Sequence, residues 1–141
     1  MFDAVAAAAR VPVGTDGATR WIDTTTARGR YLVVDAPADR VDPTGAQAVV
    51  VVVAVTDGPL PDTRRHVELA RVNGVARWVV YLDDTGIKDV EITDLVEQEV
   101  RELVAGGHEL PVVRSRGNPR AHVMGGPAAL ASALDALGLV S

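Results

Sequence analysis

The segment from Val49 to Val55 contains six valines and one alanine. Valine branches at Cβ, which favours extended backbone, and a strand with no polar side chain on either face is typically buried on both faces. Strands of this kind are typical of the centre of a parallel sheet that is covered by helices. The valine segment therefore predicts an α/β protein with a helix layer on each side of its sheet.

Strand-like and helix-like segments alternate along the rest of the chain, separated by turn residues such as Asn73-Gly74. A short gap at residues 27–29 between two strand-like runs indicates a hairpin. We therefore predict one domain over residues 1–141: an α/β, three-layer, mostly parallel sheet with helices on both faces and one antiparallel edge hairpin. The predicted strands are residues 21–26, 30–35, 49–55, 78–82 and 111–113, the predicted helices are 3–10, 62–72, 92–104 and 127–137, and 11–20 is a predicted loop.

Length and composition exclude several classes of protein. The chain has 141 residues, 48% hydrophobic and 23% charged, which is ordinary for one folded domain. It has no cysteine, which excludes disulfides, cysteine–zinc sites and a thiol nucleophile. A net charge of -5 argues against nucleic acid as a partner. No apolar run approaches the about 20 residues of a membrane-spanning helix, so we expect a cytoplasmic protein that does not bind a membrane.

Acidic residues follow several of the predicted strands. Ligands of parallel sheets bind beyond the carboxyl ends of the strands, so these positions are the first place to look for chemistry. Asp35, Asp57, Asp83 and Asp84 could offer carboxylate oxygens to a divalent cation, which makes a metal-dependent enzyme one hypothesis. Acids at strand ends also cap helices and turns, and we prefer that interpretation.

A second group of charges follows the last predicted strand. Arg114, Arg116 and Arg120 surround a loop that contains Gly117 and Pro119. Arginine binds carboxylates and phosphates through two parallel hydrogen bonds. These three arginines are therefore candidates for binding an anion or an acidic partner, and the alternative is an exposed, solvated loop.

The segment Thr56-Asp57-Gly58-Pro59-Leu60-Pro61-Asp62-Thr63-Arg64-Arg65-His66 resembles the GTPase domain of elongation factor Tu. That family has aspartate-glycine-proline-methionine-proline-glutamine-threonine-arginine-glutamate-histidine at this place. The resemblance continues through the strand at residues 78–82 and is clear again in the sequence LVEQEVREL at residues 95–103. It covers residues 30–114 and implies the fold of a GTPase with a doubly wound sheet.

The phosphate-binding residues of that family are changed here. A phosphate-binding loop needs the pattern G-x-x-x-x-G-K-[ST], and the only lysine, Lys88, stands in no such frame. The likeness begins after the family's first strand, so we expect that strand and its loop to be missing. By resemblance, Asp35 stands where an aspartate holds magnesium through water, and Ala38 replaces the glycine that contacts the γ-phosphate.

The base-selecting residues are changed as well. The family selects guanine with asparagine-lysine-x-aspartate, and this chain has Asp83-Asp84-Thr85-Gly86 there. An acid, Asp84, replaces the lysine that stacks on the base, and Gly86 replaces the aspartate that pairs with it. The next base-contacting loop falls at Arg116. The resemblance therefore supplies a fold but not a nucleotide site.

These observations predict a catalytically inactive GTPase-like domain without a cofactor, acting through protein contacts as an adaptor or regulatory module. In the family, helices of the region 91–104 meet exchange factors and the ribosome, which implies a protein-binding face there. A missing strand would also leave a sheet edge open for a partner or a second copy. The alternative hypothesis is a relative that binds GTP or GDP with magnesium through a rebuilt site.

Overall fold

The structure is a computed structural model of the chain, and it describes residues 14–16, 19–25, 30–35, 46–105, 110–118 and 124–137. In the first three ranges it describes the course of the backbone, and side chains are described for 46–104, 110–118 and 124–137. The helix predicted at residues 3–10 lies outside the described residues. Among the described helices, none is both long and apolar enough to cross a membrane.

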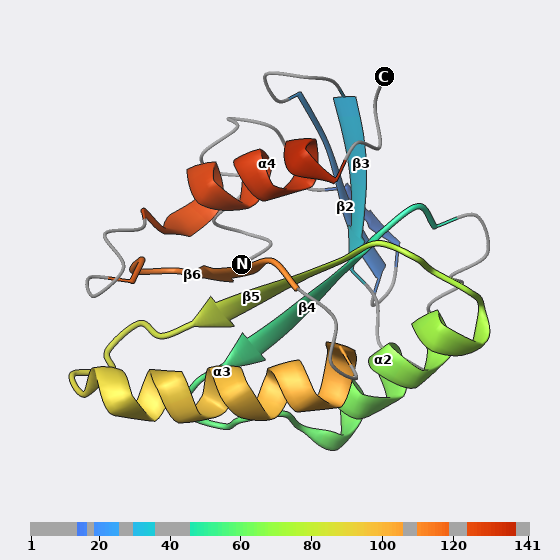
Figure 1. Cartoon of the computed structure of the whole chain (residues 1–141). Helices are drawn as coiled ribbons and strands as arrows, with labels where there is room; N and C mark the ends of the chain where they lie inside the picture. Colours follow the sequence, from blue (N-terminus) through green and yellow to red (C-terminus); the bar gives the residue numbers. More distant parts are fainter. Residues whose placement is uncertain are drawn as a thin grey trace.

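A three-stranded parallel sheet lies at the centre of the described structure (Figure 1). Its strands, in spatial order, are β4 (Val49–Ala54), β5 (Trp78–Asp83) and β6 (Val112–Arg114). The parallel strand predicted from the valines is confirmed, but its predicted central position is wrong. β5 pairs with both neighbours and is buried over four consecutive residues, whereas β4 is an edge strand of this sheet and its Val52 side chain is 39% exposed.

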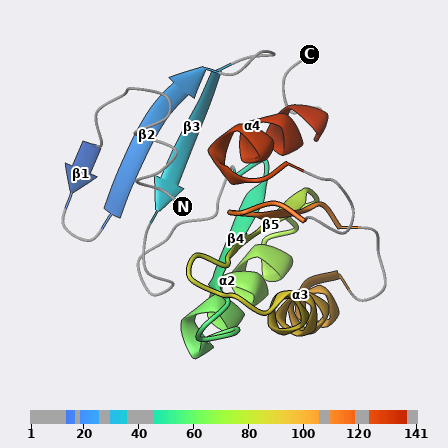
Figure 2. The same ribbon diagram turned by 90° about the vertical axis from the view of Figure 1, so that its left-hand side faces the viewer.

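Helices cover both faces of the parallel sheet, as predicted from the sequence. Their bounds are α2 (Pro61–Val72), α3 (Val90–Ala105) and α4 (Gly126–Ala136). α2 and α3 lie on one face and α4 on the other (Figure 2). On the first face Val53 and Leu82 belong to one hydrophobic core, and on the second face Tyr81 packs with Leu130. Alternate residues of each strand therefore serve two separate cores.

The antiparallel strands form a sheet of their own. They are β1 (Gly14–Asp16), β2 (Thr19–Thr25) and β3 (Arg30–Asp35). The predicted antiparallel pairing of the two longer strands is confirmed, with Ile22 beside Val33. Their predicted place at the edge of the parallel sheet is not seen, because no ladder joins β3 to β4 within the described strands. A strand extends a sheet only by hydrogen bonding to its edge strand, and the described partner of β3 is β2.

The loop predicted over residues 11–20 is wrong in part. Gly14–Asp16 forms β1, and β2 already begins at Thr19. Glycine has a low strand preference, but antiparallel pairing with β2 supplies backbone hydrogen bonds that offset it. Asp16 pairs with Thr19, which leaves two residues between the paired positions, a length typical of a tight hairpin.

The outer edge of β4 is a distinct surface of the described sheet. Val49 N donates to Arg77 O at 3.0 Å and Val55 N to Asp83 O at 2.9 Å, so alternate residues of β4 bond to the neighbouring chain segment. The N–H and C=O groups of Val50 and Val52 consequently point away from β5. No described strand pairs with them.

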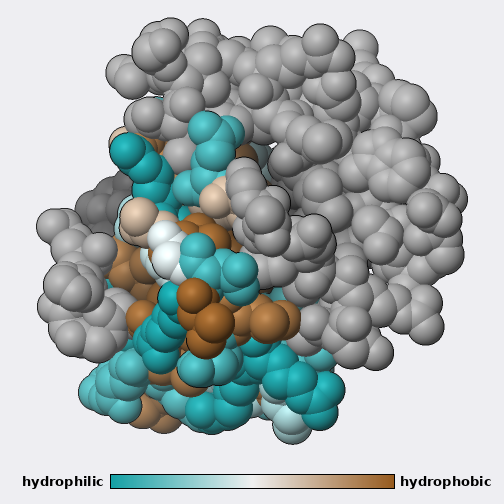
Figure 3. Space-filling model, turned by 90° about the vertical axis from the view of Figure 1, so that its right-hand side faces the viewer, coloured by the Kyte–Doolittle hydropathy of each residue, from teal (hydrophilic) through white to brown (hydrophobic). Residues whose placement is uncertain are grey.

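Some large hydrophobic side chains reach the surface. Val72, Leu95 and Met124 are 74%, 68% and 84% exposed. In the space-filling view, hydrophobic residues emerge between hydrophilic ones on the described part of one side of the molecule (Figure 3). Scattered apolar side chains are normal on a protein surface, so only those that gather with other features bear on function.

Two leucines provide a test of the core assignment. Leu82 is fully buried in β5, so we expect Leu82→Ala to lower the free energy of unfolding by about 2–5 kcal/mol, through lost burial and the cavity left behind. Leu95→Ala is the matched control, because this exposed side chain should change stability by less than about 0.5 kcal/mol. Urea unfolding of both variants measures the difference. Equal losses would contradict the described core.

Candidate functional site

The carboxyl ends of β5 and β6 are joined by the side chains that follow them. The hydroxyl of Ser115 donates to Asp84 Oδ1 at 2.7 Å, and the backbone N–H of Arg116 donates to the same oxygen at 3.0 Å. In return, Asp84 N donates to Ser115 Oγ at 3.1 Å. Asp84 is 7% exposed, and its Oδ1 is directed into the loop after β6.

Asp83 takes part in the same junction. Its Oδ1 accepts a hydrogen bond from Thr85 N at 3.1 Å and lies 3.4 Å from the hydroxyl of Ser115. A hydrogen bond from the Thr85 side chain is the main cause that lowers the pKa of Asp83 below its ordinary value. The backbone N–H of Thr85 and the Ser115 hydroxyl act in the same direction, while partial burial opposes them.

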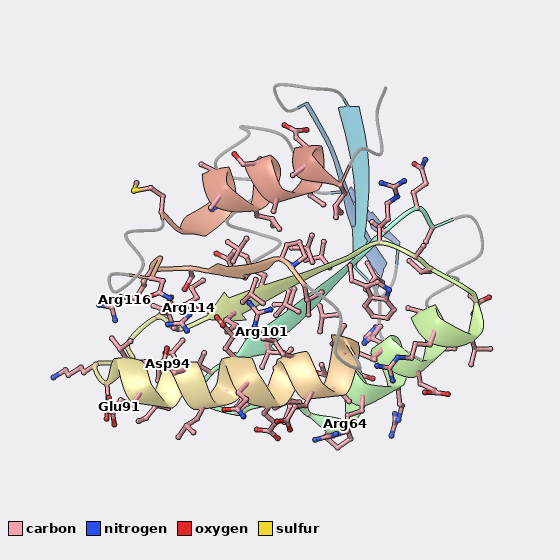
Figure 4. All side chains as sticks on the ribbon, viewed as in Figure 1. Arg64, Glu91, Asp94, Arg101, Arg114 and Arg116 are labelled. Atoms are coloured by element: carbon pink, nitrogen blue, oxygen red, sulfur yellow. The ribbon has the colours of Figure 1, made fainter. Side chains whose placement is uncertain are left out.

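Arg114 lies buried between β6 and α3 and is 6% exposed. Its Nη2 is 2.7 Å from Asp94 Oδ1, and its Nε is 3.1 Å from Glu97 Oε1 (Figure 4). Burial by itself would lower the pKa of Arg114, but hydrogen bonds and charges from Asp94 and Glu97 outweigh it and raise the pKa. Both carboxylates come from one face of α3, because Glu97 follows Asp94 by three positions, nearly one turn of the helix.

The ion pairs continue from α3 toward the segment before β6. Glu97 Oε2 also lies 3.2 Å from Arg101 Nε. Arg101 Nη1 then donates to the carbonyl of Leu110 at 2.8 Å. These contacts join α3 to the end of β6 through Arg114 and to the segment before β6 through Arg101. Both arginines therefore stabilise the packing of α3.

Glycines allow the loop after β6 to approach the start of α4. Gly117 has φ of 75°, in the left-handed region that side chains disfavour. A Cβ atom on Gly125 would overlap the backbone N of Gly117 and the carbonyl of Arg114. The close packing of these two backbone segments therefore requires glycine at position 125.

An open cavity of about 570 Å³ lies at this edge of the sheet. Its wall combines charged, polar and apolar side chains from the ends of both strands and the starts of α3 and α4. The described residues that line it are Asp84, Ile87, Lys88, Val90, Thr93, Arg114, Arg116, Gly117, Asn118 and Met124. A cavity of this size is within the range of small-molecule sites.

The arginine prediction needs a correction. Arg114 was predicted to bind an anion or a partner, but it is buried and paired with two carboxylates of α3. Arg116 is exposed at the cavity and donates from Nη1 to the carbonyl of Ile87 at 2.7 Å. Arg120 lies outside the described residues. Of the predicted basic group, Arg114 therefore stabilises the fold, and Arg116 is a charge on the surface.

The four predicted acids, Asp35, Asp57, Asp83 and Asp84, are described only in part. Asp83 and Asp84 lie together, whereas Asp57 is exposed in the turn after β4. Asp35 ends β3 in the other sheet, and neither its side chain nor Ala38 is described. Across the described ranges, no three His, Asp or Glu side chains gather closely enough to hold a metal ion. Gly86, with φ of 81°, lies in the exposed turn that follows these acids.

Two features of the site were missed in the sequence. The acidic partners of Arg114 were not identified, although Asp94 and Glu97 have the spacing of one helix face. From the sequence, Lys88 was noted only as a lysine that does not belong to a phosphate-binding loop. The structure places Lys88 in the wall of the cavity. Their role depends on the packing of α3 against β6, which joins residues far apart in the chain.

No family model matches this chain. The parallel sheet and its helices agree with an α/β fold in general kind. The resemblance to the elongation factor Tu GTPase domain consequently rests on the residues quoted above, and the GTPase fold stays a prediction.

The ion pairs of Arg114 can be tested by removing its charge. We expect Arg114→Gln to lower the free energy of unfolding by roughly 3 kcal/mol, because Asp94 and Glu97 lose their buried counter-charge. Arg64→Gln is the control, since Arg64 and Glu99 are both about half exposed and 3.7 Å apart, and such pairs contribute about 1 kcal/mol or less. Denaturant unfolding distinguishes the two. A loss for Arg114→Gln no larger than that of the control would contradict the structural role of Arg114.

Proposed function

We propose that this protein is a GTPase-like domain, similar to that of elongation factor Tu, which does not hydrolyse GTP and acts by binding another protein. The observation that carries the proposal is the hydrogen bonding of Asp84. By resemblance, a lysine that stacks on guanine belongs at this position. Here a carboxylate is turned into the loop after β6 and held by Ser115 and Arg116.

The phosphate side of a nucleotide site lacks its groups as well. Phosphoryl transfer depends on backbone amides of a glycine-rich loop, a lysine and a bound magnesium ion. The sequence contains no G-x-x-x-x-G-K-[ST] pattern, and its single lysine follows the base-selecting segment. Arg114, the cation nearest to the end of β6, already neutralises two carboxylates. These residues support a domain that retains the family's core without its chemistry.

The outward face of α3 supports a protein contact. Ile92 and Leu95 are large apolar side chains exposed on this helix. Three exposed acids lie on the same helix, Glu91, Glu99 and Glu102, of which Glu99 is also 3.7 Å from Arg64. An apolar centre with an acidic rim fits a partner with a basic surface and an apolar side chain at its middle. The family resemblance, which implies partner binding by helices of this region, agrees with this choice.

Self-association is a second form of protein contact. The outer edge of β4 offers the N–H and C=O groups of Val50 and Val52, and the edge of a sheet is a template for pairing with another chain. A partner strand there would extend the parallel sheet. The proposal therefore includes homo-oligomers among the complexes to be measured.

A nucleotide-binding relative remains the second candidate function. The open cavity with Lys88 and Arg116 at its wall is the observation in its favour, since it lies at the carboxyl edge where such sheets bind ligands. GTP or GDP, with magnesium, would then be held by residues that the family does not use. The metal-dependent enzyme has no comparable support among the described residues.

A thermal-shift titration with GDP and GTP, each with and without magnesium, separates these candidates. We expect no guanine-specific shift, because no residue in the described part of the chain is placed to bind the base or the phosphates in the family's manner. A bound nucleotide at a hundredfold excess over Kd would stabilise the protein by about 2.7 kcal/mol. Elongation factor Tu serves as positive control and ADP as the specificity control. A shift that requires magnesium and prefers GDP over ADP would reject the proposal.

The contact face can be tested with matched charge substitutions. We expect Leu95→Asp to abolish, and high salt to weaken, complexes that the wild-type protein forms in lysate of its source organism. Val72→Asp on α2 is the control, because Val72 is equally exposed but lies outside this face. Affinity capture and sedimentation of the wild type and both variants provide the readout. Complexes that survive Leu95→Asp unchanged would exclude the α3 face.

A further inference from the structure

The charges around the cavity are not equally available to a ligand. Arg114 is buried and neutralised by Asp94 and Glu97. Asp84 is buried, and one of its oxygens accepts two hydrogen bonds from the loop after β6. A buried charge that already has its partners contributes little to recognition from solvent. Among the described charged residues that line the cavity, Arg114 and one oxygen of Asp84 are therefore used by the fold.

The other two charged residues are both cations. Lys88 and Arg116 are exposed at the cavity, and neither forms an ion pair with a carboxylate in the part of the chain that the structure describes. One Arg116 nitrogen is engaged by the Ile87 carbonyl, which fixes the side chain near the rim. The rest of the guanidinium remains able to donate to an anion.

Apolar groups form another part of the same wall. Ile87 and Val90 are half-buried, and Met124 is 84% exposed. A methionine side chain is flexible and polarizable, so it adapts to ligands of different shape. The cavity thus combines exposed positive charge with an apolar surface.

The start of α4 adds to the positive potential. This helix of 11 residues begins directly after Met124 and Gly125, and its N-cap Gly125 provides no side-chain hydrogen bond. Its first turn holds no acidic residue. The positive end of a helix dipole favours negative charge nearby, although Pro127 in the first turn has no N–H to donate. This contribution supports the cations and is secondary to them.

We infer that this cavity binds a small organic anion: a phosphate or carboxylate group held by Arg116 and Lys88, with an apolar body against Ile87, Val90 and Met124. This inference goes beyond the proposed function, which concerns a different surface. It assigns the cavity an anionic ligand because its acid is turned inward and its outward charges are positive.

Calorimetric titration of the full chain with phenyl phosphate, inorganic phosphate, benzoate and benzyl alcohol tests the inference. We expect saturable binding of phenyl phosphate at millimolar or lower Kd. Inorganic phosphate should bind more weakly because it has no apolar body, and benzoate because its carboxylate carries less charge than a phosphate. Benzyl alcohol should not bind because it has no anionic group. Absence of saturable binding by any of the anions would overturn the inference.

Matched variants locate the binding. Arg116→Gln and Lys88→Gln are each expected to weaken phenyl phosphate binding about tenfold or more, the effect of losing one hydrogen bond to a charged group. Met124→Ala should weaken phenyl phosphate and leave inorganic phosphate unchanged. Arg65→Gln on α2 is the control, since it removes an equal charge at an exposed position away from the cavity. A loss in Arg65→Gln as large as in Arg116→Gln would mean unspecific attraction and overturn the site.

The outcome is separable from that of the proposed function. Magnesium-dependent preference for GDP over ADP would reject the non-nucleotide proposal, whatever phenyl phosphate does. Binding of phenyl phosphate that is insensitive to magnesium and lost in Arg116→Gln would support the anion cavity by itself.

Discussion

The ion pairs of Arg114 are the interaction on which the carboxyl edge of the sheet depends. A guanidinium buried between a strand and a helix is tolerated only when its charge is met, and Asp94 and Glu97 meet it from adjacent turns of α3. Because the helix is held this way, its first turn and the segment before it are placed beside the end of β6. The cavity wall follows from that placement.

The pairing of buried charges within the fold also determines which charged side chains remain available to bind a ligand. Asp84 is tied to the loop after β6, and Arg114 is tied to α3, so neither is offered to solvent. Lys88 and Arg116 have no comparable partner among the described residues, and they give the cavity a positive rim. The exposed charged side chains among the described lining residues are therefore positive, although this edge of the sheet is acidic in sequence. Hydrogen bonding and ion pairing within the fold, rather than composition, decide which charges remain.

The proposed function combines the resemblance to elongation factor Tu with the geometry of this edge, because only the resemblance relates Asp84 to a base-binding lysine. By that resemblance, the residues that hold phosphates and select guanine in the family are changed in this sequence. Asp84 stands where the resemblance expects a lysine. Its Oδ1 accepts hydrogen bonds from Ser115 and Arg116, so it joins the end of β5 to the loop after β6. The described surfaces on which we propose that a partner binds are the face of α3 with exposed acidic and apolar side chains and the outer edge of β4.

Local pattern in the sequence determined most of the elements from residue 49 onward: α2, α3, α4 and β4 to β6 were predicted within two residues of their bounds. Helical periodicity and valine-rich runs are encoded by neighbours in the chain, so they can be read there. Three results came only from tertiary structure: the separate sheet of the hairpin, the central position of β5, and the burial of Arg114. Each depends on contacts between distant residues, such as Arg114 with Asp94, and no local spacing specifies those contacts. The sequence by itself determined which elements form, and the packing decided which charges are left to bind a ligand.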